Sequence, residues 1–273
     1  VRAVFSLTDF GCLYERKGET VRRFPKEKKQ IFRKKYPRRF SPKDIHFAEM
    51  DHDDMILLNY TSGTTGFTKG VMLTVNNLTG NIIFGLNEKI HYPGSRALAI
   101  LPLAHAYGCM FDFLYPLACG THITLLGKMP SPKILLEALA EVKPYLVICV
   151  PLILEKIYKK QIVPVLEKAG IRFALNIPLI ESTIYTRIRK KLIAAFGGEF
   201  FEVIVGGAPL NEEVEAFLLK IKFPFTVGYG MTECGPLISY AQYDTFIAGS
   251  CGRALPGLME VTIESEDPQN VEG

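Results

Sequence analysis

From residue 51 onward, short apolar runs alternate with stretches in which apolar residues recur at helical spacing. The short runs are bounded by Gly or Pro and have the length of buried strands. They predict strands at 55–58, 71–74, 98–101, 122–126, 145–150, 201–205 and 225–227. Alternation of strands and helices is typical of a mostly parallel sheet with helices packed on it. The pattern therefore predicts an α/β fold of mostly parallel sheets flanked by helices.

The helical stretches carry recognisable start and stop signals. Ser131 begins a stretch that keeps helical spacing to residue 142, with Pro in its first turn. Asn211 precedes 212–219, whose acidic first turn favours the positive end of the helix dipole. A longer stretch, 181–196, stops at two glycines. We expect a helix at each of these three places.

The end of the chain has a different character. Apolar and polar side chains alternate at 259–264, which predicts an antiparallel strand. We therefore divide the chain into a basic lead-in at 1–50, an α/β core at 51–248 and the start of a β-barrel-like subdomain at 249–273. Because the chain opens on Val1 and stops in an acidic, turn-like segment, we expect it to be a piece of a longer protein.

Composition narrows the class of protein. With 48% hydrophobic residues, a chain of 273 residues has enough apolar material for a sizeable core, which argues against global disorder. No apolar run reaches the length of a bilayer span, and no signal peptide is visible. The six cysteines form no Cys-x-x-Cys pair, which fits reduced, buried thiols in a cytoplasmic protein better than disulfides or zinc.

Positive charge is concentrated near the N-terminus. The net charge of the chain is only +4, yet residues 22–43 hold eleven Lys and Arg residues and one acid, Glu27. This run fits a solvated helix and loop, which we favour, or a contact with an anionic membrane surface, which stays open. Nucleic acid is the least favoured partner, because no recognised nucleic-acid module accompanies the run.

A segment rich in glycine and hydroxyl groups, Tyr60–Val71, lies between two of the expected strands. Its glycines let backbone N–H groups turn inward, while the hydroxyls and a lysine add donors for phosphate. The order differs from the common nucleotide loops, because neither Gly-Lys-Ser/Thr nor Gly-x-Gly-x-x-Gly is present. A polar linker is the alternative, but linkers rarely join two buried strands. We expect a phosphate-binding loop.

Two further polar loops follow expected strands. Gly228–Glu233 offers the ring of Tyr229 for stacking on a flat ligand, the hydroxyl of Thr232 and the carboxylate of Glu233, which suits Mg²⁺. Gly206–Leu210 has small residues against which a planar group could lie, although an ordinary turn fits equally well. Since all three loops follow strands, we expect them at one edge of the sheet.

In this order, the loops closely resemble those of the adenylate-forming superfamily, most of all its long-chain fatty acid–CoA ligases. The resemblance covers nearly the whole chain after residue 50. Tyr60–Val71 resembles the family's phosphate loop, and Leu101–Gly108 resembles its acid-binding segment. Gly206–Leu210 resembles the adenine-side segment, and Tyr229–Glu233 resembles the Tyr-Gly-x-Thr-Glu motif. Gly249–Gly257 resembles the stretch before the ribose-binding region. One departure is Thr68, which stands where most relatives have Pro, a residue that would stiffen the turn.

The resemblance implies a two-step reaction. A carboxylate attacks the α-phosphate of ATP, giving acyl-AMP and pyrophosphate, and coenzyme A then takes the acyl group. Transfer of this kind needs positioning and charge neutralisation more than a protein nucleophile. By resemblance, the catalytic residues are Lys69, His105, Thr232 and Glu233, with Glu233 also binding Mg²⁺. His105 would sit near the acyl carboxylate, although a structural histidine bonded to a neighbouring carbonyl is an alternative.

The resemblance also implies an ATP site made of three groups of residues. The β- and γ-phosphates would be held by Thr61, Ser62, Gly63, Thr64, Thr65, Gly66 and Lys69. The adenine and the α-phosphate would contact Gly207, Ala208, Pro209, Gly228, Tyr229, Gly230, Met231 and Thr232. The family's lysine-bearing C-terminal segment has no match here, so we expect this chain to bind ATP weakly and not to complete adenylation at a normal rate.

The carboxylic acid that would be activated is less well defined by the sequence. Residues 106–117 are aromatic and apolar, which fits either the wall of a tunnel or the core. Asp112 follows Phe111 as in amino-acid-activating relatives, but it lies too close to Pro116 and we interpret it as unrelated. We favour a fatty or other apolar acid. Aryl and amino acids stay open, as does a non-catalytic nucleotide- or lipid-binding relative, against which the intact Thr232–Glu233 pair argues.

Overall fold

The computed structural model describes residues 2–6, 9, 11–18, 21–61, 68–127, 130–262, 264–265 and 267. The chain forms two compact units, Val1–Met50 and Asp51–Gly273. The boundary between the two units falls where the sequence changes from the basic lead-in to the α/β core. Each unit is described by itself.

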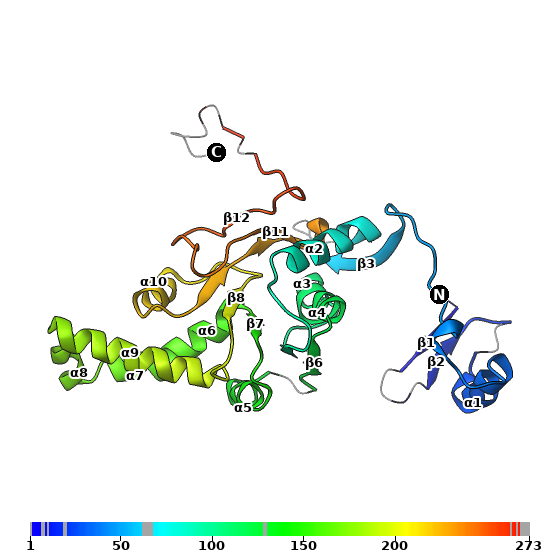
Figure 1. Cartoon of the computed structure of the whole chain (residues 1–273), viewed down its shortest axis with the longest axis horizontal. Helices are drawn as coiled ribbons and strands as arrows, with labels where there is room; N and C mark the ends of the chain where they lie inside the picture. The colour runs from blue at the N-terminus through cyan, green and yellow to red at the C-terminus, as the bar shows by residue number, and fades with distance from the viewer. Residues whose placement is uncertain are drawn as a thin grey trace. The chain divides into compact units, whose positions relative to one another are not determined.

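The N-terminal unit consists of a hairpin and a basic helix (Figure 1). Strand β1 (Ala3–Phe5) pairs antiparallel with β2 (Cys12–Glu15). Helix α1 (Phe24–Lys35) and the short turn η1 (Pro42–Asp44) follow. The rings of Phe32, Tyr36 and Phe40 pack together, with centroids 4.9–5.6 Å apart. Every Lys and Arg of the run 22–43 is exposed, so the run has the helix-and-loop form that the sequence favoured.

A five-stranded parallel sheet forms the centre of the second unit, in the order β6-β5-β7-β8-β9. Its strands are β5 (Arg96–Ala99), β6 (His122–Leu125), β7 (Leu146–Cys149), β8 (Glu202–Val205) and β9 (Phe225–Val227). The predicted α/β fold is confirmed. Strand β5 lies two residues before its predicted position, because the N–H groups of Ile100 and Leu101 donate to the Asp112 carboxylate instead of extending the ladder.

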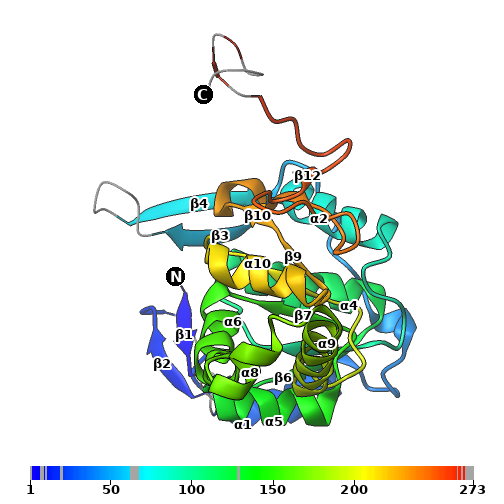
Figure 2. The same cartoon turned by 90° about the vertical axis from the view of Figure 1, so that its left-hand side faces the viewer.

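Helices cover both faces of this sheet (Figure 2). Successive strand residues point to opposite faces, so Val147 and Cys149 of β7 enter one core while Leu146 and Ile148 enter the other. Over the first core lie α5 (Pro132–Val142), α6 (Pro151–Ile157), α9 (Pro178–Ala195) and α10 (Glu212–Lys220). Over the second lie α2 (Val75–Asn87), the π-helical η2 (Cys109–Leu114) and α4 (Tyr115–Cys119).

The helix caps read from the sequence form as predicted. The Ser131 hydroxyl accepts from the Ile134 N–H at 3.3 Å, and the Asn211 side chain accepts from two N–H groups of α10. Helix α9 begins three residues earlier than predicted, at Pro178, because Pro fits the first turn of a helix. The remaining helical segments are α3 (Ala106–Gly108), η3 (Tyr158–Ile162), α7 (Val163–Leu166) and α8 (Ala169–Ala174).

The glycine-rich loop joins the strands of a hairpin rather than following a strand of the parallel sheet. Strand β3 (Met55–Thr61) pairs antiparallel with β4 (Lys69–Thr74) in a separate two-stranded sheet. The expectation that all three polar loops follow strands of one parallel sheet is therefore wrong. A short loop brings consecutive strands back beside each other, whereas a parallel neighbour needs a longer crossover.

A second antiparallel sheet contains β10 (Tyr229–Gly230), β11 (Leu237–Tyr240) and β12 (Arg253–Ala254). The strand predicted at 259–264 does not form over 259–262, which lie in a loop, and residue 263 lies outside the described residues. Both edges of β11 are already paired, by β10 and by β12. An alternating pattern by itself does not make a strand, because a strand also needs an edge to pair with.

Two properties of the chain as a whole bear on its class. Within the described ranges, no helix combines the length and the apolar character that crossing a bilayer requires. All six cysteines are free thiols, but burial is uneven: Cys119 and Cys149 are buried, whereas Cys251 is exposed. The expectation of buried thiols thus holds for only some of them.

Candidate functional site

A small pocket of about 50 Å³ lies where β8 and β9 end. Its walls combine three segments that the sequence singled out with the end of β8 and the start of β11. The lining residues are His105, Tyr107, Phe111, Ile204, Gly206, Gly207, Gly228, Tyr229, Gly230, Met231, Thr232, Pro236 and Leu237. Seven of the predicted site residues therefore meet at one place: His105, Gly207, Gly228, Tyr229, Gly230, Met231 and Thr232.

The loop after β8 offers bare backbone to the pocket. Gly207 has a φ of +86°, a conformation that favours glycine. A Cβ atom at Gly206 would lie 3.0 Å from the Tyr107 hydroxyl, so any other residue there would crowd that ring. Ala208 and Pro209 are exposed and do not line the pocket. The flat surface expected here is thus formed by Gly206 and Gly207.

The loop after β9 folds tightly back on β11. The Met231 N–H donates to the Pro236 carbonyl at 2.8 Å. A Cβ atom at Gly230 would overlap that same carbonyl oxygen, so the close approach requires glycine. Tyr229 pairs with Ser239 across the sheet, but its side chain remains 52% exposed. Its ring is therefore free at the rim of the pocket while its backbone is fixed.

Thr232 and Glu233 begin the short 3-10 turn η4 (Thr232–Cys234). Thr232 is half-buried and lines the pocket, whereas Glu233 is exposed. No group of three or more His, Cys, Asp or Glu side chains gathers among the residues that the structure describes. Mg²⁺ is usually bound by one or two carboxylates together with phosphate oxygens and waters. A single exposed carboxylate beside the pocket is compatible with that mode of binding if the ligand brings phosphate oxygens.

Thr61 and Lys69 face each other as cross-strand partners at the ends of β3 and β4. Lys69 is exposed, as is Thr68 before it. Strand β4 also contacts η4, which places the hairpin beside the Thr232 turn (Figure 2). The loop residues between them, Ser62, Gly63, Thr64, Thr65 and Gly66, lie outside the described residues.

His105 caps the short helix α3. Its Nδ1 accepts the N–H of Tyr107 at 3.2 Å, and the exposed imidazole lines the pocket. This contact is a structural role for His105, made with an N–H group rather than with a neighbouring carbonyl. In the neutral ring the proton then lies on Nε2, which becomes a hydrogen-bond donor.

Tyr107 and Phe111 are pocket residues that the sequence did not assign. The Tyr107 hydroxyl donates to the Ile204 carbonyl at 3.3 Å, and burial raises the pKa of this phenol well above its ordinary value. Both residues belong to the apolar stretch 106–117, which the sequence allowed to be either part of the core or the wall of a tunnel. Met110 and Tyr115 are fully buried, so the stretch is mostly core, and two of its rings reach the pocket. Pro236 ends the glycine-rich segment that the sequence singled out but was given no role, and Leu237 lies just beyond that segment.

Asp112 is buried beneath the segment that carries His105. One carboxylate oxygen accepts the N–H groups of Ile100 and Leu101, each at 2.8 Å. Burial raises the pKa of this carboxyl group to about 7, although the two N–H donors act in the opposite direction. Asp112 is therefore engaged with the backbone, which agrees with its interpretation as unrelated to an amine-binding aspartate.

A family model for the AMP-binding enzymes matches residues 12–273. The chain belongs to this family. The resemblance to the adenylate-forming superfamily, drawn from the loops, is thereby confirmed. Among solved structures, ATP-bound MatB from Rhodopseudomonas palustris superposes with a TM-score of 0.59 at 21% identity, covering 80% of this chain and 39% of that one. At this identity the likeness concerns the fold alone.

Curated relatives of the family include ligases for different acids. A long-chain-fatty-acid–CoA ligase of Mycobacterium bovis is 28% identical over 235 residues, which cover 77% of this chain and 38% of the relative. The 4-coumarate–CoA ligase 1 of Narcissus pseudonarcissus is 30% identical over 233 residues, covering 76% and 37%. The chain thus spans less than two-fifths of the length of these relatives.

Proposed function

We propose that this chain forms the nucleotide- and acid-binding core of an acid–CoA ligase. Such an enzyme joins a carboxylic acid to AMP, releases pyrophosphate and then transfers the acyl group to coenzyme A. The observation that carries the proposal is the convergence of His105, Gly207, Tyr229 and Thr232 on one pocket. These residues come from three separate loops of the sequence. Each loop matches a different segment of the family.

Each side chain of the pocket has a chemical task in this proposal. Tyr229 stacks on adenine, whose other face lies against Gly206 and Gly207. Thr232 donates to the α-phosphate, and Lys69 with the hairpin loop holds the departing pyrophosphate. Donors that are fixed before the reaction stabilise developing charge without reorganisation, which favours transfer at phosphorus. The Nε2–H of His105 donates to the carboxylate of the acid and orients it. Glu233 would hold Mg²⁺, which supplies charge neutralisation at the phosphates.

Loss of the Glu233 carboxylate tests the ligase proposal against the non-catalytic alternative. For Glu233→Gln in the full-length protein we expect acid-dependent pyrophosphate release to fall by about 100-fold while ATP binding changes little, because the missing charge matters most as the transition state forms. The matched control is Glu212→Gln, another exposed acid at the start of a helical turn. No acid-dependent pyrophosphate release from the unaltered full-length protein, with ATP still bound, would favour a relative that only binds nucleotide. Equal, measurable release by both proteins would exclude Glu233 from the reaction.

The acid that we propose is apolar, with a long-chain fatty acid first. Tyr107, Phe111 and Leu237 give the pocket an apolar wall, and fatty-acid ligases are among the relatives. An aryl acid is the second candidate, because the two rings could stack on it and a 4-coumarate ligase is also a relative. Pyrophosphate release with palmitate, octanoate, 4-coumarate, benzoate and an amino acid decides between them. Preference for the amino acid would contradict both candidates.

We also propose a cytoplasmic location with peripheral membrane contact through residues 22–43, whose Lys and Arg side chains are all exposed. Binding to anionic vesicles and to oligonucleotides, each measured over a salt series, tests this contact. Both would weaken with salt, since exposed charges are screened. Tighter binding to the oligonucleotide than to vesicles would contradict the membrane assignment.

A further inference from the structure

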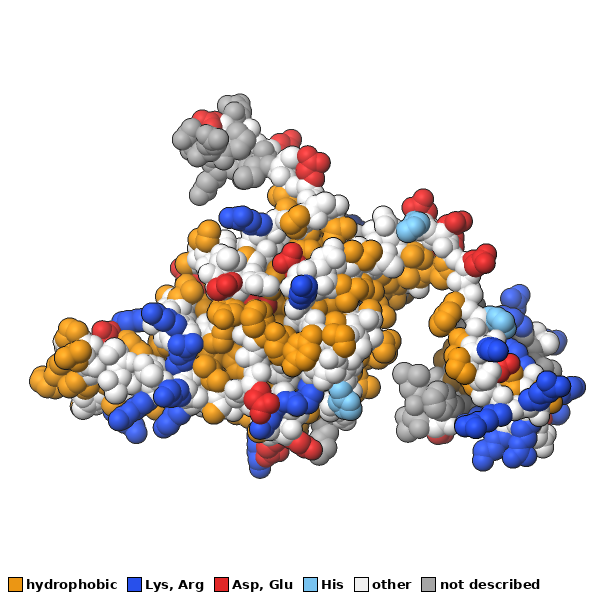
Figure 3. Space-filling model, in the orientation of Figure 1, with side chains coloured by type: hydrophobic (Ala, Val, Ile, Leu, Met, Phe, Trp, Pro, Cys, Tyr) orange, Lys and Arg blue, Asp and Glu red, His pale blue; other side chains and the backbone are white. Residues whose placement is uncertain are grey.

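The arm formed by η3, α7, α8 and the first half of α9 ends in exposed apolar side chains. We define the apolar tip as Phe173, Ile177, Leu179 and Ile180, at the joint between α8 and α9. Phe173 is 74% exposed and Leu179 is 84% exposed. Figure 3 shows apolar atoms gathered at the end of this arm, at the left edge of the molecule. Apolar side chains that cluster on a surface commonly mark a binding site.

Cations lie behind the apolar tip along the same arm. We define the cation belt as Lys168, Arg172, Arg187, Lys190 and Lys191, all of which are exposed. None of them forms an ion pair with another residue in the part of the chain that the structure describes. The nearby acid Glu181 is already paired with Lys220 at 2.9 Å. The other acid of the arm, Glu167, is exposed beside Lys168, so the arm carries a net positive charge (Figure 3).

An open groove of about 520 Å³ lies along the same arm, beside part of the cation belt. Its apolar walls come from Val165 and Ile171 on one side and from Ile184 on α9. Arg187 and Lys191 also line it. The apolar groove and part of the cation belt thus adjoin each other, and the apolar tip lies at the end of the same arm. The groove shares no lining residue with the pocket at His105 and Tyr229.

We propose that this surface docks on a lipid bilayer that contains anionic headgroups. A bilayer presents acyl chains below a layer of phosphates, and the arm presents apolar side chains at its end with cations set back from them. Shallow insertion of the tip would place the belt at the headgroup level, where long basic side chains bury their stems and keep their charges at the phosphates. A second copy of the chain is a poorer occupant, because two basic arms would repel each other.

A single fluorescent reporter tests insertion directly. The chain contains no Trp, so Leu179→Trp gives one probe at the apolar tip. We expect its emission to shift to the blue, and to be quenched by brominated acyl chains, on vesicles of phosphatidylcholine with phosphatidylserine. The matched control is Ile247→Trp, at a site that is 67% exposed elsewhere in the same unit. No shift at Leu179→Trp, or an equal shift at Ile247→Trp, would overturn the proposal.

Vesicle sedimentation of the full chain tests how much the apolar tip and the cation belt contribute to membrane binding. Phe173→Ser with Leu179→Ser, and separately Arg187→Gln with Lys191→Gln, are each expected to weaken binding to these vesicles at least ~10-fold, because apolar burial and basic charge both contribute. Ile83→Ser with Leu117→Ser, at sites 53% and 59% exposed, is the matched control and should bind normally. Thermal unfolding confirms that each variant is folded.

The basic run 22–43 belongs to the other unit and is a separate source of vesicle binding. Lys28→Gln with Lys29→Gln should leave the blue shift of Leu179→Trp intact. If these two changes abolish the shift, the arm does not insert and the proposal fails. A blue shift that appears without vesicles and grows with protein concentration would assign the tip to self-association instead, which also overturns it.

Discussion

Asp112 shows how one buried side chain can set the shape of a loop. Its carboxylate accepts two backbone N–H groups at the point where β5 ends and the His105 segment begins. Asp112→Ala leaves both N–H groups without this acceptor, at a cost of about 1–3 kcal/mol for the buried Ile100 N–H and less for the half-buried Leu101 N–H. Asp112→Asn keeps an oxygen that can accept both. We therefore expect the Ala variant to unfold at markedly lower urea concentration and the Asn variant to stay near the unaltered protein. Equal midpoints for all three would contradict this role.

The titration of buried Glu202 makes the stability of the fold depend on pH. It is fully buried, and it accepts from the Tyr240 hydroxyl and from the Tyr243 N–H, yet burial raises the pKa of its carboxyl group to about 7. The folded state therefore holds a proton that the unfolded state has lost between the ordinary pKa of 4.5 and about 7. Stability from this group falls as pH rises through that window, by an amount on the order of 3 kcal/mol.

Glu202→Gln isolates that contribution from other titrating groups. The buried His91, whose pKa burial lowers to about 4, acts in the opposite direction, because it loses stability as pH falls below its ordinary value. Both proteins contain His91, so its effect cancels in the comparison. We expect the free energy of unfolding of Glu202→Gln to increase relative to that of the unaltered protein from pH 5 to pH 8, because only the unaltered protein loses stability over this range. A difference that does not depend on pH would exclude Glu202 as the source.

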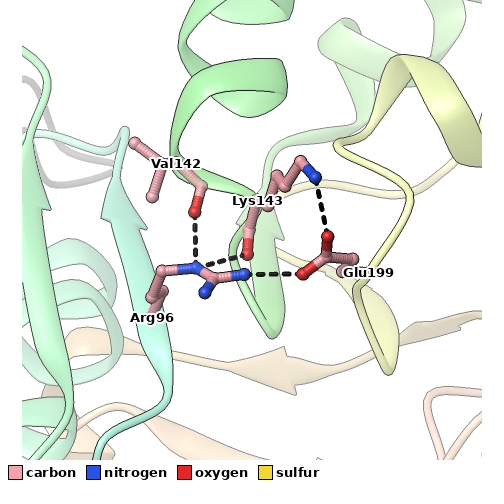
Figure 4. A network of polar contacts seen from close by, with 4 residues as sticks. All are labelled: Arg96, Val142, Lys143 and Glu199. Carbon is pink, nitrogen blue, oxygen red and sulfur yellow. Dashed lines mark hydrogen bonds and ion pairs between the residues drawn. The ribbon is translucent and has the colours of Figure 1, made fainter.

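At the scale of secondary-structure elements, the side chain of Arg96 contacts two other parts of the fold besides its own strand (Figure 4). Its Nε donates to the carbonyls of Val142 and Lys143 at 2.7 and 3.1 Å, at the end of α5. Its guanidinium also pairs with Glu199, before β8, at 2.7 Å, and Lys143 pairs with the same carboxylate. These partners lower the pKa of Glu199. Arg96 thereby joins the start of β5 to the end of α5 and to the loop that enters β8.

The two kinds of contact made by Arg96 predict an order of stability. Arg96→Ala loses the ion pair and also the bonds to the last carbonyls of α5, so we expect its Tm to fall by about 2–4 °C. Glu199→Gln loses two exposed ion pairs, with Arg96 and with Lys143, but such pairs are worth little and are screened by salt. The Tm of Glu199→Gln should therefore fall less than that of Arg96→Ala. At high salt, Glu199→Gln and the unaltered protein should have the same Tm. A larger effect for Glu199→Gln would contradict this order.

At the scale of the whole molecule, the chain divides into two units at residue 50. Residues 45–50 between them belong to no helix or strand, and Phe47 is 88% exposed. Exposed, unpaired backbone is the preferred site of proteolysis. We expect brief digestion with chymotrypsin to cut first at Phe47 and to leave the second unit intact, as mass spectrometry would show. Phe47→Ser should remove this cut. A first cut within 68–127 or 130–262 would contradict the division.

The sequence alone predicted those features that depend on neighbours in the chain. The strands of the parallel sheet, the caps at Ser131 and Asn211, and the glycines of the two pocket loops were all predicted from runs of a few residues. Such features follow from local rules: apolar periodicity selects an element, a cap satisfies free N–H groups, and glycine permits close backbone approach. The family resemblance of the loops rests on the same short segments.

Only the tertiary structure decided which distant residues meet. The glycine-rich loop proved to join a hairpin, Asp112 ended β5 early, and Tyr107 reached Ile204, which lies 97 positions away. The apolar tip and its cations are likewise unremarkable in sequence and lie on one arm only because α8 turns back into α9. Strand pairing, burial and pocket lining are set by contacts between segments far apart in the chain, and a local pattern of apolar and polar residues carries no record of those partners.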